Sequence, residues 1–284
     1  MVDVRVLGIV GAGQMGGGIA QVAAQVGIAV RLIDVDERAA RNGLGAVEKQ
    51  LAARVSKGKL SAEERDAMLA RIQISSDLEL LAGADFVIEA ATEDNEVKRR
   101  IFEAADRIAP AHAVLATNTS AIPITKLAAH TRRPEQVIGM HFMNPAPVMR
   151  LVEIIRGLQT SDQTIEVTRA LASRMGKDLI GANDVPGFIV NRMLIPFLNE
   201  ACFALQEGLG SPEDIDRGAK LGLNHPMGPL ELADLIGLDT VLYMAEVLHR
   251  EFGDDKYRPP TILRNHVSAG WLGRKSGRGF YKYE

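Results

Sequence analysis

The chain has 284 residues and a mass of 30.7 kDa, more than one typical domain of roughly 100–200 residues, which predicts one large or two unequal domains. A hydrophobic share of 46 %, a charged share of 24 % and a net charge of −3 exclude a disordered chain and offer no basic surface for nucleic acid. There is no apolar stretch of membrane-spanning length and no leader-like start, and the single Cys202 can form neither an internal disulfide nor a zinc site. We therefore expect a cytoplasmic protein with no metal and no membrane or nucleic-acid partner.

Short apolar runs alternate with helical patterns through residues 1–183, which is typical of β-α-β units that build a parallel sheet. Between residues 36 and 72 the pattern is helical, with an interruption at residues 56–59 and a new helix start at Ser61, where an N-cap precedes acidic residues. We expect a helical hairpin there. The apolar runs predict strands at 4–10, 29–34, 86–90, 113–117, 137–141, 150–155 and 177–182.

Turn formers and a proline at residues 183–187 predict the domain boundary, which gives domains 1–183 and 184–284. Beyond it apolar residues recur only at helical spacing, and Pro212, Pro229 and Asp239 mark further helix starts. The fold class expected is an α/β Rossmann-like N-terminal domain with a mostly parallel sheet, followed by an all-α C-terminal domain. Such a domain often holds a dimer, although its apolar residues could equally pack only against one another.

A glycine-rich turn directly follows the first predicted strand. Its glycines permit a tight turn and close approach of the backbone to a pyrophosphate, whose charge the helix N-terminus then binds. Asp34 ends the second strand 34 − 16 = 18 residues later, where a carboxylate binds the ribose hydroxyls and repels a 2′-phosphate, so NAD is favoured over NADP. The alternative is a structural turn with Asp34 as a helix cap. The predicted cofactor contacts in the turn are Gly11, Gly13, Gln14, Met15 and Gly16.

Polar residues at the carboxyl ends of later strands are the candidates for chemistry, because open α/β sheets bind ligands there. Ser120 follows the predicted strand 113–117, His141 ends the predicted strand 137–141, and Glu153 lies among four aliphatic residues of the next run. A buried glutamate needs a partner, and His141 is the one that fits chemically. A His–carboxylate pair can exchange a proton with a substrate oxygen, although His141 could be structural and Ser120 could cap a helix near Ile122.

Six motifs, taken together, resemble those of the short-chain L-3-hydroxyacyl-CoA dehydrogenases, and most closely the bacterial 3-hydroxybutyryl-CoA members of that family. The resemblance covers essentially the whole chain. It implies NAD-dependent interconversion of a short 3-hydroxyacyl-CoA and the 3-ketoacyl-CoA by a homodimer formed through the helical domain. The motifs occupy residues 11–20, 116–120, 141–147, 184–192, 224–230 and 273–281.

The resemblance also assigns roles to individual residues. His141 matches the catalytic acid/base and Glu153 its carboxylate partner, while Ser120 and Asn191 match residues that hold the reacting oxygen and the thioester region. For coenzyme A, a small basic cluster in the helical hairpin favours Lys57, although such clusters are usually solvated. The further cofactor contacts that it implies are Glu93, Lys98, Asn118, Ser120, Asn144 and Lys275.

Two other functions remain open on the residues alone. A His–Glu pair is indifferent to what is attached to the substrate's C1, so a related NAD-dependent 3-hydroxy-acid or sugar-acid dehydrogenase is one alternative. A non-catalytic NAD-binding protein on the same fold is the other. The presence of Ser120, His141, Glu153 and Asn191 together argues against the second.

Overall fold

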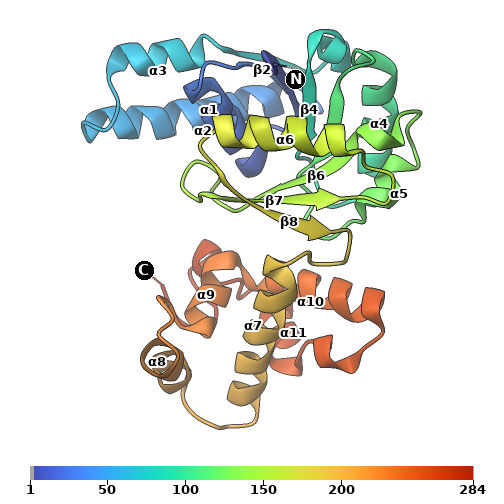
Figure 1. Cartoon of the computed structure of the whole chain (residues 1–284). Coiled ribbons are helices and arrows are strands. Elements are labelled where there is room, and N and C mark those ends of the chain that lie inside the picture. Colours follow the sequence, from blue (N-terminus) through green and yellow to red (C-terminus); the bar gives the residue numbers. More distant parts are fainter. Residues whose placement is uncertain (1–2, 284) are drawn as a thin grey trace. The chain divides into compact units, whose positions relative to one another are not determined.

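The computed structural model describes residues 3–283 and separates into two compact units, one ending at Val185 and the other beginning at Pro186. The first unit is built on an eight-stranded sheet, and the second is helical (Figure 1). The expected fold class, a mostly parallel α/β unit followed by a helical one, is therefore confirmed. Among the described residues, no helix combines the length and the apolarity that crossing a membrane requires.

The sheet of the first unit has the order β3-β2-β1-β4-β5-β6-β7-β8. Its first six strands by position are parallel, β7 runs antiparallel to β6, and β8 runs parallel to β7. The carboxyl ends of the first six strands consequently meet at one edge, where ligands of such sheets bind. The strands are β1 (Val6–Val10), β2 (Ala29–Ile33), β3 (Ile72–Ser75), β4 (Phe86–Glu89), β5 (Val114–Thr117), β6 (Val137–Phe142), β7 (Leu151–Arg156) and β8 (Asp178–Asn183).

Helices of the first unit pack their apolar sides on this sheet and close its core. Strands such as β4 and β6 are buried along their whole length, which explains why they appear in the sequence as continuous apolar runs. The helices are α1 (Gln14–Gln25), α2 (Glu37–Ser56), α3 (Ala62–Leu69), α4 (Asn95–Ile108), α5 (Ile124–Ala128) and α6 (Asp162–Arg174), with 3₁₀ turns η1 (Leu78–Gly83) and η2 (Pro134–Gln136).

The expected helical hairpin is present as α2 and α3, which extend together at the left of Figure 1. Ser61 caps α3 as expected, in a reciprocal capping box with Glu64. The expectation that helix continues to Ile72 is wrong, because helix α3 ends at Leu69 and Ile72 begins strand β3, which pairs with β2 at the edge of the sheet. The run Ile-Gln-Ile-Ser alternates between apolar and polar residues, but an alternation of four residues is too short to predict a strand.

In the described part of the second unit, residues 186–283, five α-helices surround a small core that includes Leu198, Leu238 and Leu263, each fully buried. The helix starts expected at Pro212 and Pro229 are confirmed, and helix α10 begins one residue before Asp239. The helices are α7 (Val190–Gln206), α8 (Pro212–Gly222), α9 (Pro229–Ile236), α10 (Leu238–Phe252) and α11 (Thr261–Ser268), with 3₁₀ turns η3 (Asp255–Tyr257) and η4 (Arg274–Ser276).

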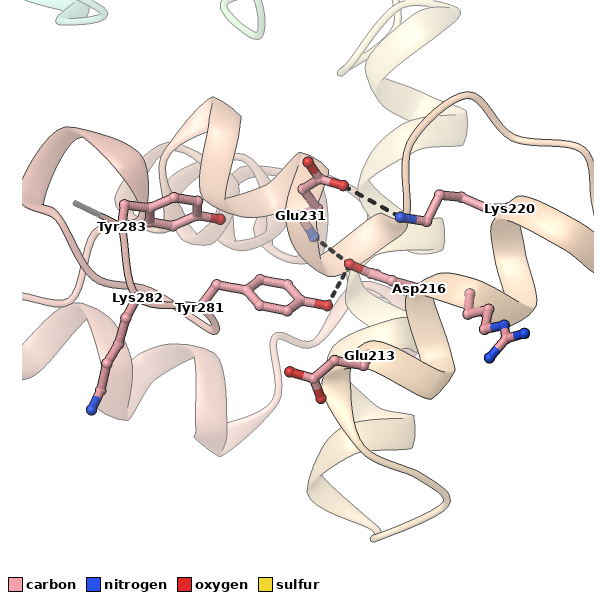
Figure 2. A pocket seen from close by; sticks show the side chains of 8 residues that line it. Glu213, Asp216, Lys220, Glu231, Tyr281, Lys282 and Tyr283 are labelled. Atoms are coloured by element: carbon pink, nitrogen blue, oxygen red, sulfur yellow. Dashed lines mark hydrogen bonds and ion pairs between the residues drawn. The ribbon is translucent and has the colours of Figure 1, made fainter.

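Two buried aspartates tie the last described residues to the helices of this unit. Asp216 of α8 accepts the N–H groups of Leu230 and Glu231, in the first turn of α9, and the hydroxyl of Tyr281 at 2.8 Å (Figure 2). Asp234 of α9 accepts the hydroxyl of Tyr283 at 2.9 Å and two backbone N–H groups of the same segment. Burial and the bond to Asp234 raise the pKa of Tyr283 to about 12. The segment 280–283 is thereby an integral part of the helical unit.

Candidate active site

The glycine-rich turn joins β1 to α1 in a conformation that only glycine allows. Gly11 has φ +107°, and a Cβ there would lie 2.5 Å from the carbonyl oxygen of Ala90. Gly13 is the N-cap of α1, and no side chain caps this helix end. Its first turn therefore presents backbone N–H groups and the positive end of the helix dipole, as an anion site requires.

The outer side of this turn is accessible at Gly13 and Gln14. Met15 is half-buried. A Cβ added to Gly13 would meet no atom within 4 Å, so the backbone there is open to a ligand. Asp34 lies beside the turn, with Oδ2 accepting the Ala12 N–H at 2.6 Å.

Asp34 keeps acceptor capacity for ribose hydroxyls, because each oxygen receives one backbone N–H in the structure. The alternative role of Asp34 as a helix cap is wrong. The N-cap of α2 is Asp36, whose side chain accepts the Ala39 N–H at 2.7 Å.

His141 and Glu153 face one another across the antiparallel pair of β6 and β7, where they are direct register partners. The Nδ1 atom of His141 lies 2.7 Å from Oε2 of Glu153, so the expected pairing is present. The two residues are 5 % and 0 % exposed. A buried carboxylate at this distance fixes the imidazole orientation and stabilises its protonated form.

Ser120 completes the array from the loop that follows β5. Its Oγ lies 3.1 Å from Nε2 of His141, the nitrogen opposite to the one that Glu153 binds. Ser120 does not cap the helix that follows, because Asp184 accepts the Ile124 and Thr125 N–H groups that begin α5. The alternative interpretation of Ser120 as a helix cap is therefore wrong.

This arrangement can move one proton to or from a bound oxygen. The carboxylate of Glu153 holds one imidazole nitrogen, which leaves Nε2 beside the Ser120 hydroxyl for exchange with a substrate. Among residues 3–283, no group of three or more His, Cys, Asp or Glu side chains is arranged to hold a metal ion. The chemistry that the geometry supports is proton transfer, in the same unit as the uncapped N-terminus of α1.

Comparison with known proteins agrees with this site. Residues 6–185 match the NAD binding domain of 3-hydroxyacyl-CoA dehydrogenase, and residues 187–283 match the C-terminal domain of the same family. The chain belongs to the 3-hydroxyacyl-CoA dehydrogenase family. It is thus an NAD-dependent oxidoreductase, as the sequence motifs predicted.

Relatives of this dehydrogenase match over nearly their whole length. A probable 3-hydroxybutyryl-CoA dehydrogenase of Bacillus subtilis is 55 % identical, with 99 % of this chain and 98 % of the relative covered. The crystal structure of (S)-3-hydroxybutyryl-CoA dehydrogenase PaaH1 from Ralstonia eutropha is 51 % identical with a TM-score of 0.95, and covers 99 % of this chain and 100 % of that one. Human mitochondrial hydroxyacyl-coenzyme A dehydrogenase is 38 % identical, with 97 % and 90 % covered.

The other residues assigned to the cofactor in this dehydrogenase lie in three places. Glu93 accepts the Ser120 N–H at 2.5 Å, and Asn118 accepts the Phe142 N–H at 2.9 Å, so both adjoin the Ser120–His141 pair. Asn144 is exposed in the loop between β6 and β7. Lys275 belongs to the helical unit, where its Nζ lies 2.6 Å from Oδ2 of Asp239.

The residues assigned to the substrate are also separated along the fold. Asn191 lies in the first turn of α7, in the helical unit. Lys57 is exposed at the end of α2, in the turn that joins the two helices of the hairpin.

Sequence reasoning missed one charged residue of this region. Glu89 ends β4 and is 1 % exposed, and both of its carboxylate oxygens bind the Nζ of Lys98, at 2.7 and 2.8 Å. Glu89 could have been found from the sequence, because it is a glutamate in an apolar run, the same feature that singled out Glu153. The ammonium of Lys98 consequently lies inside the protein, paired with Glu89.

Proposed function

We propose that the enzyme interconverts (S)-3-hydroxybutyryl-CoA and acetoacetyl-CoA by hydride transfer with NAD. The observation that carries the proposal is the Ser120–His141–Glu153 array in the same unit as an open, uncapped helix N-terminus suited to a dinucleotide. The names of the relatives in Bacillus subtilis and Ralstonia eutropha support the choice of acyl group. Related short 3-hydroxyacyl-CoA esters are included in the proposal.

In this proposal the protein side chains transfer the proton, and the cofactor transfers the hydride. When bound, NADH supplies the hydride that is added to the substrate's C3. Protonated His141 donates its Nε2 proton to the 3-keto oxygen during reduction, and neutral His141 accepts it back during oxidation. Glu153 stabilises the positive charge on the imidazole, and the Ser120 hydroxyl orients the reacting oxygen. Asn191 is assigned to the thioester region of the substrate.

The proposed cofactor contacts follow the turn and the strand ends. Gly11, Gly13, Gln14, Met15 and Gly16 hold the pyrophosphate, and Asp34 binds the adenosine ribose, which favours NAD over NADP. Further contacts are proposed for Glu93, Lys98, Asn118, Ser120, Asn144 and Lys275.

Replacing Gly13 by alanine should weaken NADH binding while the fold is kept. The backbone at Gly13 is extended, with φ −66° and ψ −167°, and the added methyl group meets no protein atom. The loss of stability should stay below about 1 kcal/mol, whereas the methyl would occupy the space of the pyrophosphate. We expect the Kd for NADH, measured by fluorescence titration, to rise at least about tenfold.

Gly45→Ala is the matched control, because a Cβ there also meets nothing within 4 Å but lies in the middle of α2. It should leave the Kd unchanged. An unchanged Kd in Gly13→Ala would mean that the phosphates do not lie over this turn.

Lys57→Ala should raise KM for the CoA ester and leave kcat unaltered. Lys57 is exposed beside a second basic residue, Lys59, and is the proposed contact of the nucleotide phosphates of coenzyme A. A single exposed contact of this kind is worth on the order of 1 kcal/mol, so KM should rise about fivefold. A truncated thioester without the nucleotide should show no change. Lys49→Ala, on the exposed side of the same helix, is the control, and equal losses on both substrates would contradict the assignment.

The activity itself is tested by following NADH oxidation with acetoacetyl-CoA, beside acetoacetate, longer 3-ketoacyl-CoA esters and NADPH. Turnover confined to the CoA esters and to NADH is the expected result. Tight NADH binding without turnover of any CoA ester would instead favour a different 3-hydroxy acid or a non-catalytic role.

A homodimer formed through the helical unit is proposed as the assembly. Three leucines at and beside the ends of α8 are strongly exposed: Leu209 at 73 %, Leu221 at 75 % and Leu223 at 63 %. Strongly exposed large apolar side chains support the proposal that another subunit covers part of this surface. Sedimentation velocity should give twice the chain mass of 30.7 kDa, and a monomer at micromolar concentration would contradict the proposal.

The cytoplasm is the proposed compartment. Cys202 is free and buried, and burial raises the pKa of its thiol to about 12, so it is unsuited to disulfide exchange. Cell fractionation of the source organism tests this placement, and recovery outside the cytoplasm would contradict it.

A further inference from the structure

A buried lysine directly before β8 holds the loop that joins β6 to β7. Lys177 is 9 % exposed, and its Nζ donates to the carbonyl oxygens of Ala146 at 2.5 Å and Met149 at 2.8 Å. Burial lowers the pKa of this amine. Burying an ammonium is unfavourable unless hydrogen bonds compensate it, and here two of them go to one loop. No step of the proposed proton transfer uses this residue.

The direction of the last strands explains why Lys177 reaches this loop. Strand β7 runs antiparallel to β6 and β8 runs parallel to β7, so β8 begins at the edge of the sheet where β6 ends. Leu151 of β7 pairs with Asp178 of β8, which puts Lys177 level with Arg150, the residue before β7. Lys177 therefore lies at the edge to which sheets of this kind bind their ligands.

The other side of the loop packs on α1. A Cβ added to Gly18 would lie 3.1 Å from Cδ of Pro147 and 3.2 Å from Cβ of Ala146, so the loop lies directly against the helix there. Ala146 is 1 % exposed. Its side chain is thus fixed by α1 and its carbonyl by Lys177, whereas Asn144, two residues earlier, is exposed.

Asn144 is a proposed cofactor contact, and its place in the chain indicates which end of the cofactor it meets. It follows His141 by three residues. Hydride transfer requires the nicotinamide to lie beside the substrate carbon whose oxygen His141 protonates, so a residue next to His141 is placed for the nicotinamide. The proposed ribose contact, Asp34, follows β2, which β1, β4 and β5 separate from β6 in the sheet.

We infer that Lys177 is a positioning residue for the nicotinamide, because it holds the loop that carries Asn144. The inference rests on the proposed function, in which Asn144 contacts the cofactor and His141 the substrate. Lys177 acts through Ala146 and Met149 and contacts neither ligand. Removing its ammonium leaves two carbonyls without this donor and frees the loop on one side. The adenosine and pyrophosphate contacts on β1, α1 and β2 are kept.

The test uses Lys177→Met in the full chain and compares NADH with ADP-ribose, which lacks the nicotinamide. Calorimetric titration should give a Kd for NADH raised about tenfold and a Kd for ADP-ribose within about twofold of that of the unaltered enzyme. Hydrogen exchange of the segment 143–149, measured by mass spectrometry, should rise. With acetoacetyl-CoA, kcat should fall about 10- to 100-fold, because the hydride donor is misplaced.

Lys177→Gln is the second variant, since it keeps N–H donors on an uncharged side chain and buries no ammonium. It should show the same selective loss of NADH affinity to a smaller extent. A Kd for NADH that equals that of the unaltered enzyme in both variants would overturn the inference. Equal losses for NADH and ADP-ribose in Lys177→Met would also overturn it, because a loosened nicotinamide end cannot weaken a ligand that lacks it.

Asn144→Ala tests whether Lys177 acts through this residue. It should also weaken NADH and spare ADP-ribose. Because the two side chains serve one contact, the double variant with Lys177→Met should bind NADH no more weakly than the weaker of the single variants. An affinity loss equal to the product of the single losses would mean that Lys177 acts by another route, and the inference would fail.

Arg133→Met is the matched control. Arg133 is also a largely buried cation, with 11 % of its side chain exposed, and it donates to the carbonyls of Ala109 and Pro110. These lie between α4 and β5, at the edge where the parallel strands begin. Since Arg133 also pairs with Asp106, its loss should lower Tm at least as much as Lys177→Met. It should leave the Kd for NADH and the exchange of segment 143–149 unchanged.

A selective loss of NADH affinity in Arg133→Met would overturn the inference, because the effect would then follow from general destabilisation. Absence of turnover with every CoA ester in the unaltered enzyme would count against the proposed substrate alone. Ligand binding and hydrogen exchange test Lys177 without that substrate, so the two failures are distinguishable.

Discussion

Replacing His141 by alanine is expected to lower kcat by about 10²–10⁴-fold while the Kd for NADH stays near that of the unaltered enzyme. The reason is that Nε2 of His141 is the group placed to exchange the substrate proton, 3.1 Å from the Ser120 hydroxyl. The dinucleotide turn at Gly13 lies on a different strand and helix and is not altered by the substitution. A lower kcat with an unchanged Kd for NADH is therefore the expected effect of removing the His141 side chain.

Single-turnover kinetics and NADH fluorescence measure the two quantities separately. Because alanine also removes a partner of the fully buried Glu153, Tm is measured on the same sample. A variant that is folded, binds NADH and still turns over at a rate close to that of the unaltered enzyme would assign the acid/base role to another group.

Glu153→Gln is expected to lower kcat by about 10²–10⁴-fold as well, although the side chain keeps its size. A neutral amide cannot stabilise the positive imidazole that exists when His141 holds the extra proton. An amide N–H can also turn toward Nδ1, which would favour the wrong tautomer of the ring. The present distance of 2.7 Å between Nδ1 and Oε2 leaves no room for a water to take the role of the carboxylate.

The double variant His141→Ala with Glu153→Gln separates this explanation from a structural one. Because the two residues act as one unit, the double variant should lose no more kcat than His141→Ala alone. Losses that multiply would show that Glu153 contributes independently of His141. Single-turnover rates in the reductive direction give the comparison directly.

The fold could be predicted from the sequence where local signals were strong. Continuous apolar runs marked β4 and β6, and the capping pattern at Ser61 marked the start of α3. The edge strand β3 was missed because its alternating run is only four residues long, and the pairing with β2 that stabilises it involves residues about forty positions away in sequence. The antiparallel direction of β7 depends on the short connection after β6 and was not predicted.

The site could be predicted in part for the same reason. A glutamate inside an apolar run needs a partner, which is how Glu153 led to His141, and the β6–β7 register explains their twelve-residue spacing. The place of Lys98 could not be predicted, because a lysine near a helix start appears solvent-exposed in a sequence. Only the packing of α4 on β4 shows that its ammonium meets Glu89 inside the unit.

The two aspartates that bind segment 280–283 also affect the order in which the molecule can be completed during synthesis. Asp216 satisfies the N–H groups that begin α9 and accepts the Tyr281 hydroxyl, and Asp234 accepts from Phe280, Tyr281 and Tyr283. Until those residues have emerged from the ribosome, Asp234 lacks its three partners in the segment and Asp216 lacks the tyrosine hydroxyl. The helical unit can therefore reach its hydrogen-bonded form only after residue 283 has been synthesised.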